Sequence, residues 1–236
     1  MTGAAGGLGR AIVAKLVGEG IFVMALDLAE KLPASIDTSP GIHWVECDVT
    51  DPDGVDTAVR KTVELRGAID ILVNNAGILS GKGSLEEVDA RQMHRYFEVN
   101  TVGPLLMVQS CLPYLRESPH RGRIVNVASR TFYTGTSGQL AYVASKGALT
   151  GMTRVMANEL GEYGITVNAA IPSQVATPGT LEHSSEEVFI RTMNRQAIKE
   201  LVTPEDFAGL VAFLVSPEGR MVTGQSIICD GGAVMR

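Results

Sequence analysis

The sequence predicts an α/β fold, a Rossmann-like doubly wound parallel sheet that forms a single domain over residues 1–236. Short apolar runs alternate with stretches of helical pattern, which is the order expected when helices connect parallel strands. The apolar runs are continuous rather than interrupted by polar residues, which is typical of strands buried on both faces of a sheet. A glycine-rich stretch, TGAAGGLG, stands directly before the first helical pattern.

Each expected element follows from a local pattern. The first helix is expected near 8–18, where AIVAKL has the apolar spacing of a helix. The expected strands are IFVMAL (21–26), IHWVEC (42–47), AIDILV (68–73), RIVNVA (123–128), ITVNAA (165–170) and SIIC (226–229). Further helices are expected near 53–66, 101–117, 140–161, 185–199 and 204–215. The stretch of about 172–203 is the most irregular and polar, and we interpret it as an insertion over the site rather than a second domain.

Composition and charge argue against several classes of function. A formal net charge of −6 disfavours a nucleic acid or an anionic membrane as the main partner. No apolar run approaches the ~20 residues that span a bilayer, and no basic segment followed by an apolar stretch opens the chain, so a cytoplasmic protein is expected. The three cysteines are widely spaced without a CxxC, which fits buried thiols in a reducing compartment. The four histidines are also far apart, so no metal site is expected.

The opening glycines form a candidate phosphate loop. Gly3, Gly7 and Gly9 have the spacing GxxxGxG, with Leu8 between the last two. Glycines let the backbone turn sharply and let a pyrophosphate approach the N–H groups at the positive end of the following helix. A plain tight turn would give the same pattern, so the glycines alone are a weak signal.

Asp27 strengthens the prediction of a dinucleotide site. It ends an expected strand eighteen residues after Gly9. A carboxylate there can accept hydrogen bonds from both ribose hydroxyls of an adenosine. It would also repel a 2′-phosphate, by roughly 1–4 kcal/mol at close range. Because no arginine or lysine is evident near Gly6 or after Asp27, the sequence favours NAD over NADP; the alternative is a solvated aspartate at the end of a strand.

The stretch from Arg123 to Met152 carries the candidate chemistry. Tyr142 and Lys146 are four residues apart in a helical pattern, so their side chains share a face. An ammonium beside a phenol favours the phenolate, which predicts a Tyr142 pKa below its ordinary value of ~10. Such a tyrosine can take the proton of an alcohol while hydride leaves the carbon. Ser129, at the end of an expected strand, can hold the substrate oxygen against Tyr142. Taken singly, a surface pair on a helix and a strand-end cap are the ordinary explanations of these residues.

Together the motifs resemble the short-chain dehydrogenases/reductases, over nearly the whole chain from residue 2 to about 232. They are TGAAGGLG, CDVTD, NNAG at 74–77, FEVN, the serine, YVASK, and DGG at 230–232. The resemblance implies that Asp48 and Val49 lie near the adenine, and that Asn75, Ala76 and Gly77 line the cofactor. It implies that Asn100 holds a proton-relaying water and that Lys146, beside Tyr142, binds the nicotinamide ribose. It also implies carboxamide contacts from Val175 and Thr177, and a homotetramer built through the helices near 101–117 and 140–161.

Two departures from the family pattern stand out. Ser173 follows Pro172 where the family usually has glycine, and a positive φ at a serine would cost ~1 kcal/mol or more. The strand that precedes TG in the family, in the middle of the sheet, is absent. Its absence predicts two unpaired flanking strands and an open apolar groove. Three explanations stay open: a start recorded too late, a fold that tolerates the gap or replaces the strand, and a non-catalytic relative.

The sequence therefore predicts an NAD-dependent oxidoreductase that interconverts a secondary alcohol and a ketone, with Tyr142 as general acid/base. The alternatives are an NADPH-dependent 3-oxoacyl-carrier-protein reductase, a sugar, polyol or pyridoxal-type alcohol dehydrogenase, and a non-catalytic NAD-binding sensor. The substrate is expected over 172–203. The side chains expected there are Val188, Phe189, Thr192, Met193 and Arg191 or Arg195, with Arg130, Phe132 and Tyr133 also facing the pocket. This mixture suits a small or medium polar alcohol better than a long acyl chain.

Overall fold

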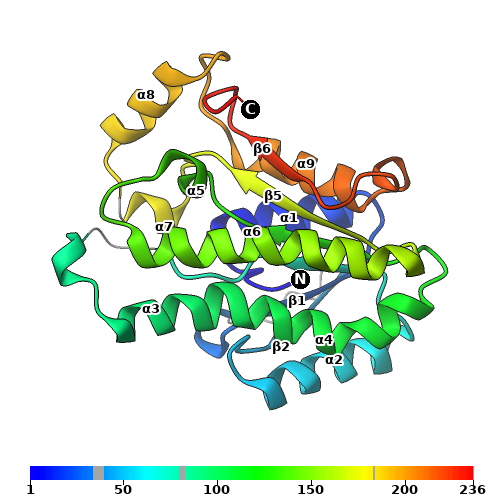
Figure 1. Cartoon of the computed structure of the whole chain (residues 1–236). Coiled ribbons are helices and arrows are strands. Elements are labelled where there is room, and N and C mark those ends of the chain that lie inside the picture. The colour runs from blue at the N-terminus through cyan, green and yellow to red at the C-terminus, as the bar shows by residue number, and fades with distance from the viewer. Residues whose placement is uncertain (34–39, 80–82, 183, 236) are drawn as a thin grey trace.

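Parallel strands with helices on both faces form the centre of the molecule (Figure 1). The computed structural model describes residues 1–33, 40–79, 83–182 and 184–235. The strands are β1 (Val23–Asp27), β2 (Ile42–Glu46), β3 (Ile71–Asn74), β4 (Arg123–Val127), β5 (Thr166–Pro172) and β6 (Ser226–Cys229). Two parallel sheets result among the described residues, a pair β1-β2 and a four-stranded sheet in the order β3-β4-β5-β6. The parallel register, for example Val73 with Val125, brings the carboxyl ends of neighbouring strands to one edge.

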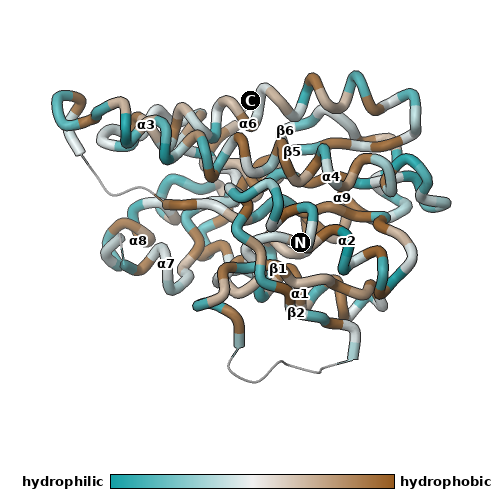
Figure 2. Tube along the Cα trace, turned by 90° about the horizontal axis from the view of Figure 1, so that it is seen from below, coloured by the Kyte–Doolittle hydropathy of each residue, from teal (hydrophilic) through white to brown (hydrophobic). Residues whose placement is uncertain are grey.

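Two layers of helices bury the apolar side chains of the strands. On one face lie α2 (Pro52–Arg66), α4 (Gly103–Glu117) and α6 (Leu140–Leu160), and on the other α1 (Gly7–Gly18) and α9 (Pro204–Val215). The remaining α-helices of the described chain are α3 (Ala90–Phe97), α5 (Thr131–Thr134), α7 (Pro178–Leu181) and α8 (Glu186–Arg195). In Figure 2 hydrophobic and hydrophilic residues alternate along the helices, as expected when one side of a helix packs and the other meets water. No helix of the described residues is both long enough and apolar enough to cross a membrane.

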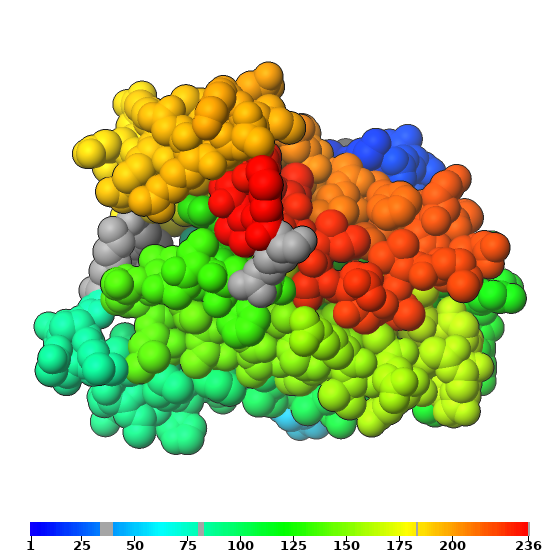
Figure 3. Space-filling view, turned by 45° about the horizontal axis from the view of Figure 1, so that its top comes forward, coloured from blue at the N-terminus to red at the C-terminus, as the bar shows by residue number. Residues whose placement is uncertain are grey.

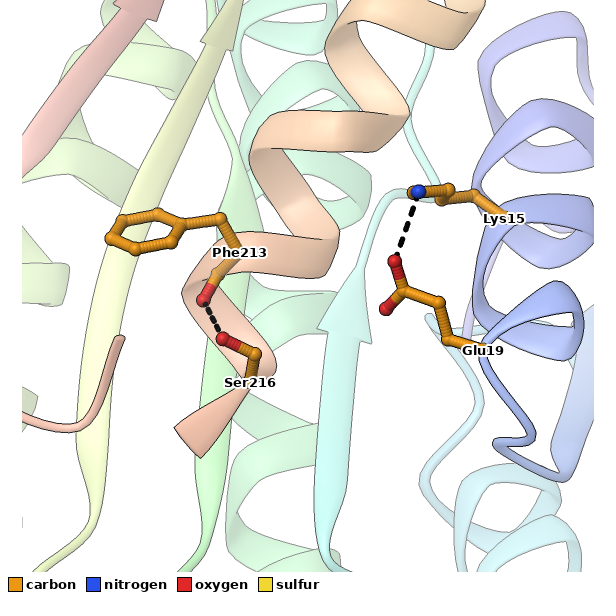
Figure 4. A network of polar contacts seen from close by, with 4 residues as sticks. All are labelled: Lys15, Glu19, Phe213 and Ser216. Atoms are coloured by element: carbon orange, nitrogen blue, oxygen red, sulfur yellow. Dashed lines mark hydrogen bonds and ion pairs between the residues drawn. The ribbon is translucent and has the colours of Figure 1, made fainter. Parts of the chain in front are cut away.

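Local hydrogen bonds fix the helix ends. Thr203 and Asp206 form a reciprocal capping box at the start of α9. At its end, the Ser216 hydroxyl donates to the Phe213 carbonyl at 2.8 Å (Figure 4). On the neighbouring α1, Lys15 and Glu19 form an exposed ion pair at 2.9 Å, also drawn there. An exposed pair four residues apart contributes only about 0.3–0.5 kcal/mol, so the α1–α9 layer is held mainly by its apolar contacts with the sheet.

A gap separates β1 from β3, as the sequence predicted. Among the described residues, backbone hydrogen bonds from the first residues of the chain connect these two edges: Leu26 N donates to the Met1 carbonyl at 2.8 Å, and Thr2 N donates to the Val73 carbonyl at 3.0 Å. A cavity of about 830 Å³ continues the gap. Its lining includes Met1 together with β1 and β3 side chains such as Met24 and Leu72.

The amino group of Met1 is buried at the end of this gap. It donates to the Met24 carbonyl at 2.8 Å, and burial lowers its pKa to about 6. Two backbone edges that face each other across a cavity are the feature of this fold that departs most from a closed α/β sheet.

The expected strands are confirmed, with ends shifted by up to three residues. The expected helices 8–18, 53–66, 140–161 and 204–215 are confirmed nearly residue for residue, whereas the helix expected at 185–199 ends at Arg195. The helix expected at 101–117 is preceded by a π-helical turn, Glu98–Val102, and begins at Gly103. Burial of β2 on both faces was a wrong prediction, because His43 and Glu46 are exposed on this edge strand.

Candidate active site

The glycine loop turns tightly between Thr2 and the start of α1. Gly3 has φ +63°, and a Cβ added there would lie 2.8 Å from the Ala76 Cα. A Cβ on Gly9 would clash with the Gly3 carbonyl oxygen, and one on Gly7 would lie 2.5 Å from the Thr177 Cβ. Only glycine fits these close approaches.

The first turn of α1 offers free N–H groups to an anion. Its N-cap is Gly6, with no side-chain cap and no acidic residue in the first turn. The unsatisfied N–H groups and the helix dipole therefore favour a phosphate at this point. The loop fits the pyrophosphate of a dinucleotide.

Thr2 and Asn75 hold this loop against the end of β3. The Thr2 hydroxyl accepts from Asn75 N at 3.1 Å and from Ala76 N at 3.0 Å. The Asn75 side-chain amide donates to the Gly3 carbonyl at 2.8 Å. These bonds bring TGAAGGLG and NNAG together although more than seventy residues separate them.

Asp27 lies at the end of β1, beside the glycine loop. Its carboxylate accepts from Ala5 N and from Leu28 N, both at 2.9 Å, and only 6% of the residue is exposed. Arg10 also lies at the loop, because its Nε donates to the Ala5 carbonyl at 2.8 Å. The expectation that no basic residue lies near Gly6 was therefore wrong, since Arg10 on the first turns of α1 reaches back to the loop.

Asp48 and Val49 follow β2. The Asp48 carboxylate accepts from the Thr50 N–H and hydroxyl, at 2.9 and 2.8 Å. Val49 is buried against Gly103, where an added Cβ would lie 2.8 Å from Val49 Cγ2. Neither residue lines the cavity described next.

A cavity of about 350 Å³ opens at the carboxyl ends of β3, β4 and β5. It brings together three of the four predicted catalytic residues and several of the residues predicted to bind the cofactor. These lining residues are Leu8, Asn75, Gly77, Ser129, Tyr142, Lys146, Val175 and Thr177. Their convergence from the glycine loop, three strand ends and α6 makes this cavity the candidate active site.

Within the cavity, Ser129 and α6 position the candidate acid/base group. Ser129 is buried, its Oγ lies 2.8 Å from the Thr131 Oγ1, and the Lys146 Nζ donates to the Val127 carbonyl at 2.9 Å. Burial lowers the pKa of Lys146 to about 8. Burial raises the pKa of Tyr142, while a hydrogen bond with Ser129 acts in the opposite direction. The predicted lowering of the Tyr142 pKa is therefore wrong for the protein alone, because the loss of water around the phenol outweighs the favourable contacts.

Asn100 occupies the π-helical turn, which sequence patterns did not predict. Its Oδ1 accepts from Ile78 N at 3.0 Å, and its Nδ2 donates to the Ser145 hydroxyl at 3.1 Å. A Cβ on Gly77 would lie 3.0 Å from the Asn100 Oδ1 and 3.3 Å from the Lys146 Nζ. Gly77 thus keeps a narrow space open between the amide and the ammonium. Single π-turns inside helices are frequent at functional sites.

The loop after β5 does not carry the predicted strain. Ser173 has no positive φ; among the non-glycine residues that the structure describes, only Arg121 does. The Ser173 N–H donates to the Cys229 carbonyl at 3.0 Å, so β6 stabilises the turn. Val175 and Thr177 are buried and line the cavity, and Thr177 caps α7 by accepting from Thr180 N.

On the substrate side, only Arg130 of the predicted side chains lines the cavity, and the prediction was wrong for Val188, Phe189 and Met193 of α8. Arg130 and Gln139 line it, whereas Phe132 and Tyr133 do not, and a Cβ on Gly147 would meet the Phe132 ring instead. Thr192 on α8 reaches the site through Arg130, whose Nη2 donates to its hydroxyl at 3.2 Å. Arg191 and Arg195 are exposed and lie outside the lining.

The segment of α8 packs against the C-terminal residues. Figure 3 shows α8 (yellow to orange) and the C-terminal residues (red) against one another above α6. Ile198 N donates to the Gly231 carbonyl at 2.9 Å, which joins the two segments. Sequence patterns could not predict this contact, since the two segments are far apart in the chain and meet only in the folded protein.

Comparison with known proteins assigns the family. A family profile described as enoyl-(acyl carrier protein) reductase matches residues 3–234. The chain belongs to the short-chain dehydrogenase/reductase family. It is 36% identical over 238 residues to the (2S)-[(R)-hydroxy(phenyl)methyl]succinyl-CoA dehydrogenase subunit of Thauera aromatica, with 98% of this chain and 94% of the relative covered.

Two further short-chain dehydrogenases/reductases show the range of relatives. The 3-oxoacyl-(acyl-carrier-protein) reductase of Thermotoga maritima is 36% identical over 240 residues, with 100% of this chain and 96% of the relative covered. The trans-4-hydroxycyclohexanecarboxylate dehydrogenase of Sinomonas cyclohexanicum is 32% identical over 243 residues, with 98% and 90% covered. As a member of the family, the protein is an oxidoreductase of alcohol and ketone groups that uses NAD or NADP.

Proposed function

We propose that the protein is an NAD-dependent oxidoreductase that interconverts a secondary alcohol and a ketone. The observation that carries the proposal is the convergence of Ser129, Tyr142 and Lys146 in one cavity that also includes Leu8 of the glycine loop. A bound nicotinamide supplies or accepts the hydride. All other roles fall to the side chains of this chain.

In oxidation, the Tyr142 phenolate takes the hydroxyl proton of the substrate, and in reduction the phenol returns it. Ser129 holds the substrate oxygen by a hydrogen bond, so that the oxygen stays beside Tyr142. The Lys146 ammonium favours the phenolate by its charge. Asn100 borders the narrow space beside Gly77. There it positions a water molecule, which relays the proton from Lys146 to the solvent.

The cofactor contacts follow the order of the loops. The N–H groups at Gly7, Leu8 and Gly9 bind the pyrophosphate, with Gly3 giving the turn. Asn75, Ala76 and Gly77 lie along the cofactor, and Val175 and Thr177 contact the carboxamide. At the other end, Asp48 and Val49 lie near the adenine.

Asp27 supports NAD as the cofactor. Its buried carboxylate stands where the adenosine ribose binds in this fold, and a 2′-phosphate there would meet a negative charge. Arg10 at the glycine loop favours NADP, since a guanidinium can bind a phosphate in a bidentate manner. We expect the carboxylate to decide the preference, because it is buried whereas Arg10 is exposed.

The names of the relatives leave the substrate open. An NADPH-dependent 3-oxoacyl-carrier-protein reductase is the second candidate, supported by the Thermotoga maritima relative. A cavity of about 350 Å³ that also takes the nicotinamide favours a small substrate over a long acyl chain. Sugar, polyol or pyridoxal-type alcohols remain within this size.

The decisive experiment is Tyr142→Phe, assayed with NAD and a panel of small secondary alcohols. We expect turnover to fall by at least ~100-fold, because general acid/base catalysis contributes ~10²–10⁴. NADH binding, followed by nicotinamide fluorescence, should be unchanged. Tyr163→Phe, which changes an exposed tyrosine in the same way, is the control and should keep full activity. Unchanged turnover in Tyr142→Phe would disprove the mechanism. If the wild type and the Tyr163→Phe control are both inactive on every alcohol, a sensor without turnover is indicated.

We also propose a cytoplasmic homotetramer built through α4 and α6. Support comes from half-exposed small and apolar residues on α6, namely Ala144, Ala148 and Met152. The free thiols of Cys47 and Cys111 fit a reducing compartment. Sedimentation equilibrium tests the assembly, and a monomer at micromolar concentration would contradict it.

A further inference from the structure

Arg130 is a half-buried cation in the catalytic cavity without a carboxylate of its own. It directly follows Ser129 and lines the same cavity. Its guanidinium donates a hydrogen bond to the Thr192 hydroxyl, and among the described residues no carboxylate oxygen lies within 4.0 Å of it. A guanidinium withdrawn from water favours an anionic partner.

The carboxylate of Asp230 acts on Arg130 from beyond ion-pair distance and takes its hydrogen bonds from the backbone. Asp230 is buried, and its oxygens accept from Gly232 N at 2.9 Å, Ala233 N at 3.1 Å and Val234 N at 2.9 Å. Burial lowers the pKa of Arg130, Asp230 opposes this effect, and Arg195 adds to it. The chain thus leaves a positive charge at the substrate side of the cavity.

Ser173 also lines this cavity, and its hydroxyl is buried and unpaired. Only 9% of the residue is exposed, and its Oγ has no hydrogen-bond partner. A buried hydroxyl without a partner costs free energy, so a ligand oxygen that accepts its proton would be bound favourably. Serine stands here where the family pattern usually has glycine, so the hydroxyl is a feature of this chain.

Arg130 and Ser173 lie at neighbouring strand ends. The register of β4 and β5 pairs Val127 with Ala170, and each of the two residues follows that pair by three positions. The strands remain joined beyond the pair, because Ala128 N donates to the Ala170 carbonyl at 3.0 Å. The two donors therefore reach the cavity from adjacent backbones.

We propose that Arg130 and Ser173 bind the carboxylate of the substrate, which is a small hydroxy acid or its oxo acid. This inference rests on the proposed function. A carboxylate accepts two parallel hydrogen bonds from a guanidinium and a third from a hydroxyl. Thr192 fixes the guanidinium in place and leaves its other N–H groups for the substrate. Because the cavity is small, only a short carbon chain or ring can separate the carboxylate from the carbinol carbon.

The test compares each acid with its uncharged ester. Lactate, 3-hydroxybutanoate and trans-4-hydroxycyclohexanecarboxylate are assayed with NAD beside their methyl esters, in the wild type, Arg130→Met, Ser173→Ala and Arg91→Met. The last variant removes an exposed arginine of α3 and is the matched control. We expect the acid-to-ester ratio of kcat/KM to fall ~100-fold in Arg130→Met and ~10-fold in Ser173→Ala, because a hydrogen bond to a charged group is lost. The control should keep the wild-type ratio, and NADH binding should be equal in all four proteins.

Two results would overturn the carboxylate site. One is a wild type that prefers the esters, and the other is an acid-to-ester ratio that Arg130→Met leaves unchanged. If the wild type turns over no alcohol at all, the proposed function fails. Whether Arg130 and Ser173 bind a carboxylate is then tested by ligand binding instead of turnover. The melting temperature is then measured with 3-oxobutanoate, with and without NADH: a rise that Arg130→Met abolishes supports the site, and no rise in the wild type refutes it.

Discussion

At the scale of the residue, Lys146 is a buried cation that costs stability. Burial lowers its pKa from 10.5 to about 8, which corresponds to a penalty of about 3 kcal/mol at pH 7. Lys146→Met removes this penalty and loses one hydrogen bond, to the Val127 carbonyl, worth about 1 kcal/mol. We therefore expect Lys146→Met to be inactive and yet more stable by about 2 kcal/mol at pH 7, as urea denaturation would show.

The stability difference between Lys146→Met and the wild type should depend on pH. Between pH 8 and 10.5 the unfolded chain holds a proton on Lys146 that the folded chain has released, so the wild type gains stability as the pH rises through this window. The advantage of Lys146→Met should therefore shrink from pH 7 to pH 10. Lys61→Met, at an exposed lysine of α2, should show neither effect. A Lys146→Met protein that is less stable than the wild type at pH 7 would contradict the argument.

Asp27 and Arg10 make opposite predictions about the cofactor. Asp27→Asn keeps an oxygen for the Ala5 or Leu28 N–H and removes the charge. We expect the ratio of NADPH to NADH affinity to rise by ~10-fold or more, since ~1.4 kcal/mol of repulsion is a factor of ten. Adding Arg10→Met should cancel much of this gain, because Arg10 is the cation at the loop. Fluorescence titration measures both, and a wild type that binds NADPH more tightly would reverse the assignment of Asp27.

Residue identities could be predicted from the sequence, but their environments could not. The YxxxK spacing placed Tyr142 and Lys146 on one face of a helix, which the structure confirms. The direction of the Tyr142 pKa depends on burial, and burial is a property of the whole fold. Arg10 was missed for a similar reason, since its contact with Ala5 exists only once the loop turns back over α1.

At the scale of the element, two glycines of α1 should respond in opposite ways to the same change. A Cβ on Gly9 would clash with the Gly3 carbonyl, so Gly9→Ala must distort the loop and should abolish NADH binding. A Cβ on Gly18 meets nothing within 4 Å, so Gly18→Ala should keep binding and add about 0.5–1 kcal/mol of stability. Calorimetry and NADH titration measure both effects, and normal NADH binding by Gly9→Ala would show that the loop does not hold the cofactor.

Elements with a strong apolar pattern were predicted well, and those held by other contacts were not. α1 and α9 have continuous apolar faces on the sheet, and their predicted bounds agree with the structure within one residue. The segment ARQMHRYF of α3 is short and mostly polar, and only Tyr96 is buried, so the helical spacing of its few apolar residues was missed. Asp89 instead starts this helix by accepting from Gln92 N at 2.7 Å. The π-helical turn at Asn100 likewise depends on bonds to Ile78 and Ser145, which no local pattern contains.

At the scale of the whole molecule, the main departure from a closed sheet is the gap between β1 and β3. The lack of strand pairing between β1 and β3 could be predicted, because the first apolar run follows the glycine loop rather than preceding it. The way in which the chain partly closes the gap could not be predicted. Met1 and Thr2 join both edges at one end, and the buried Met1 amine takes the place of a strand N–H at the Met24 carbonyl.

A strand supplied in front of Met1 should fill this gap. Thr2 pairs in parallel with Leu26, so residues placed before Met1 would run beside β1 and β3 through the cavity of about 830 Å³. For six valine- and isoleucine-rich residues, each buried side chain contributes about 2 kcal/mol and each ordered residue costs about 1.5 kcal/mol, for a net gain of about 3 kcal/mol. At this chain length the melting temperature should rise by about 6–12 °C.

A glycine- and serine-rich segment of equal length is the control, because it also moves the amine out of the cavity but cannot fill it. The amine has an effect of its own on stability. Burial lowers its pKa from the ordinary value of 8.0 to about 6, so the unextended chain should lose stability as the pH falls from 8 to 6. Both extended chains should lose this pH dependence, and only the apolar one should gain the higher melting temperature. Equal melting temperatures would show that the gap does not accept a strand.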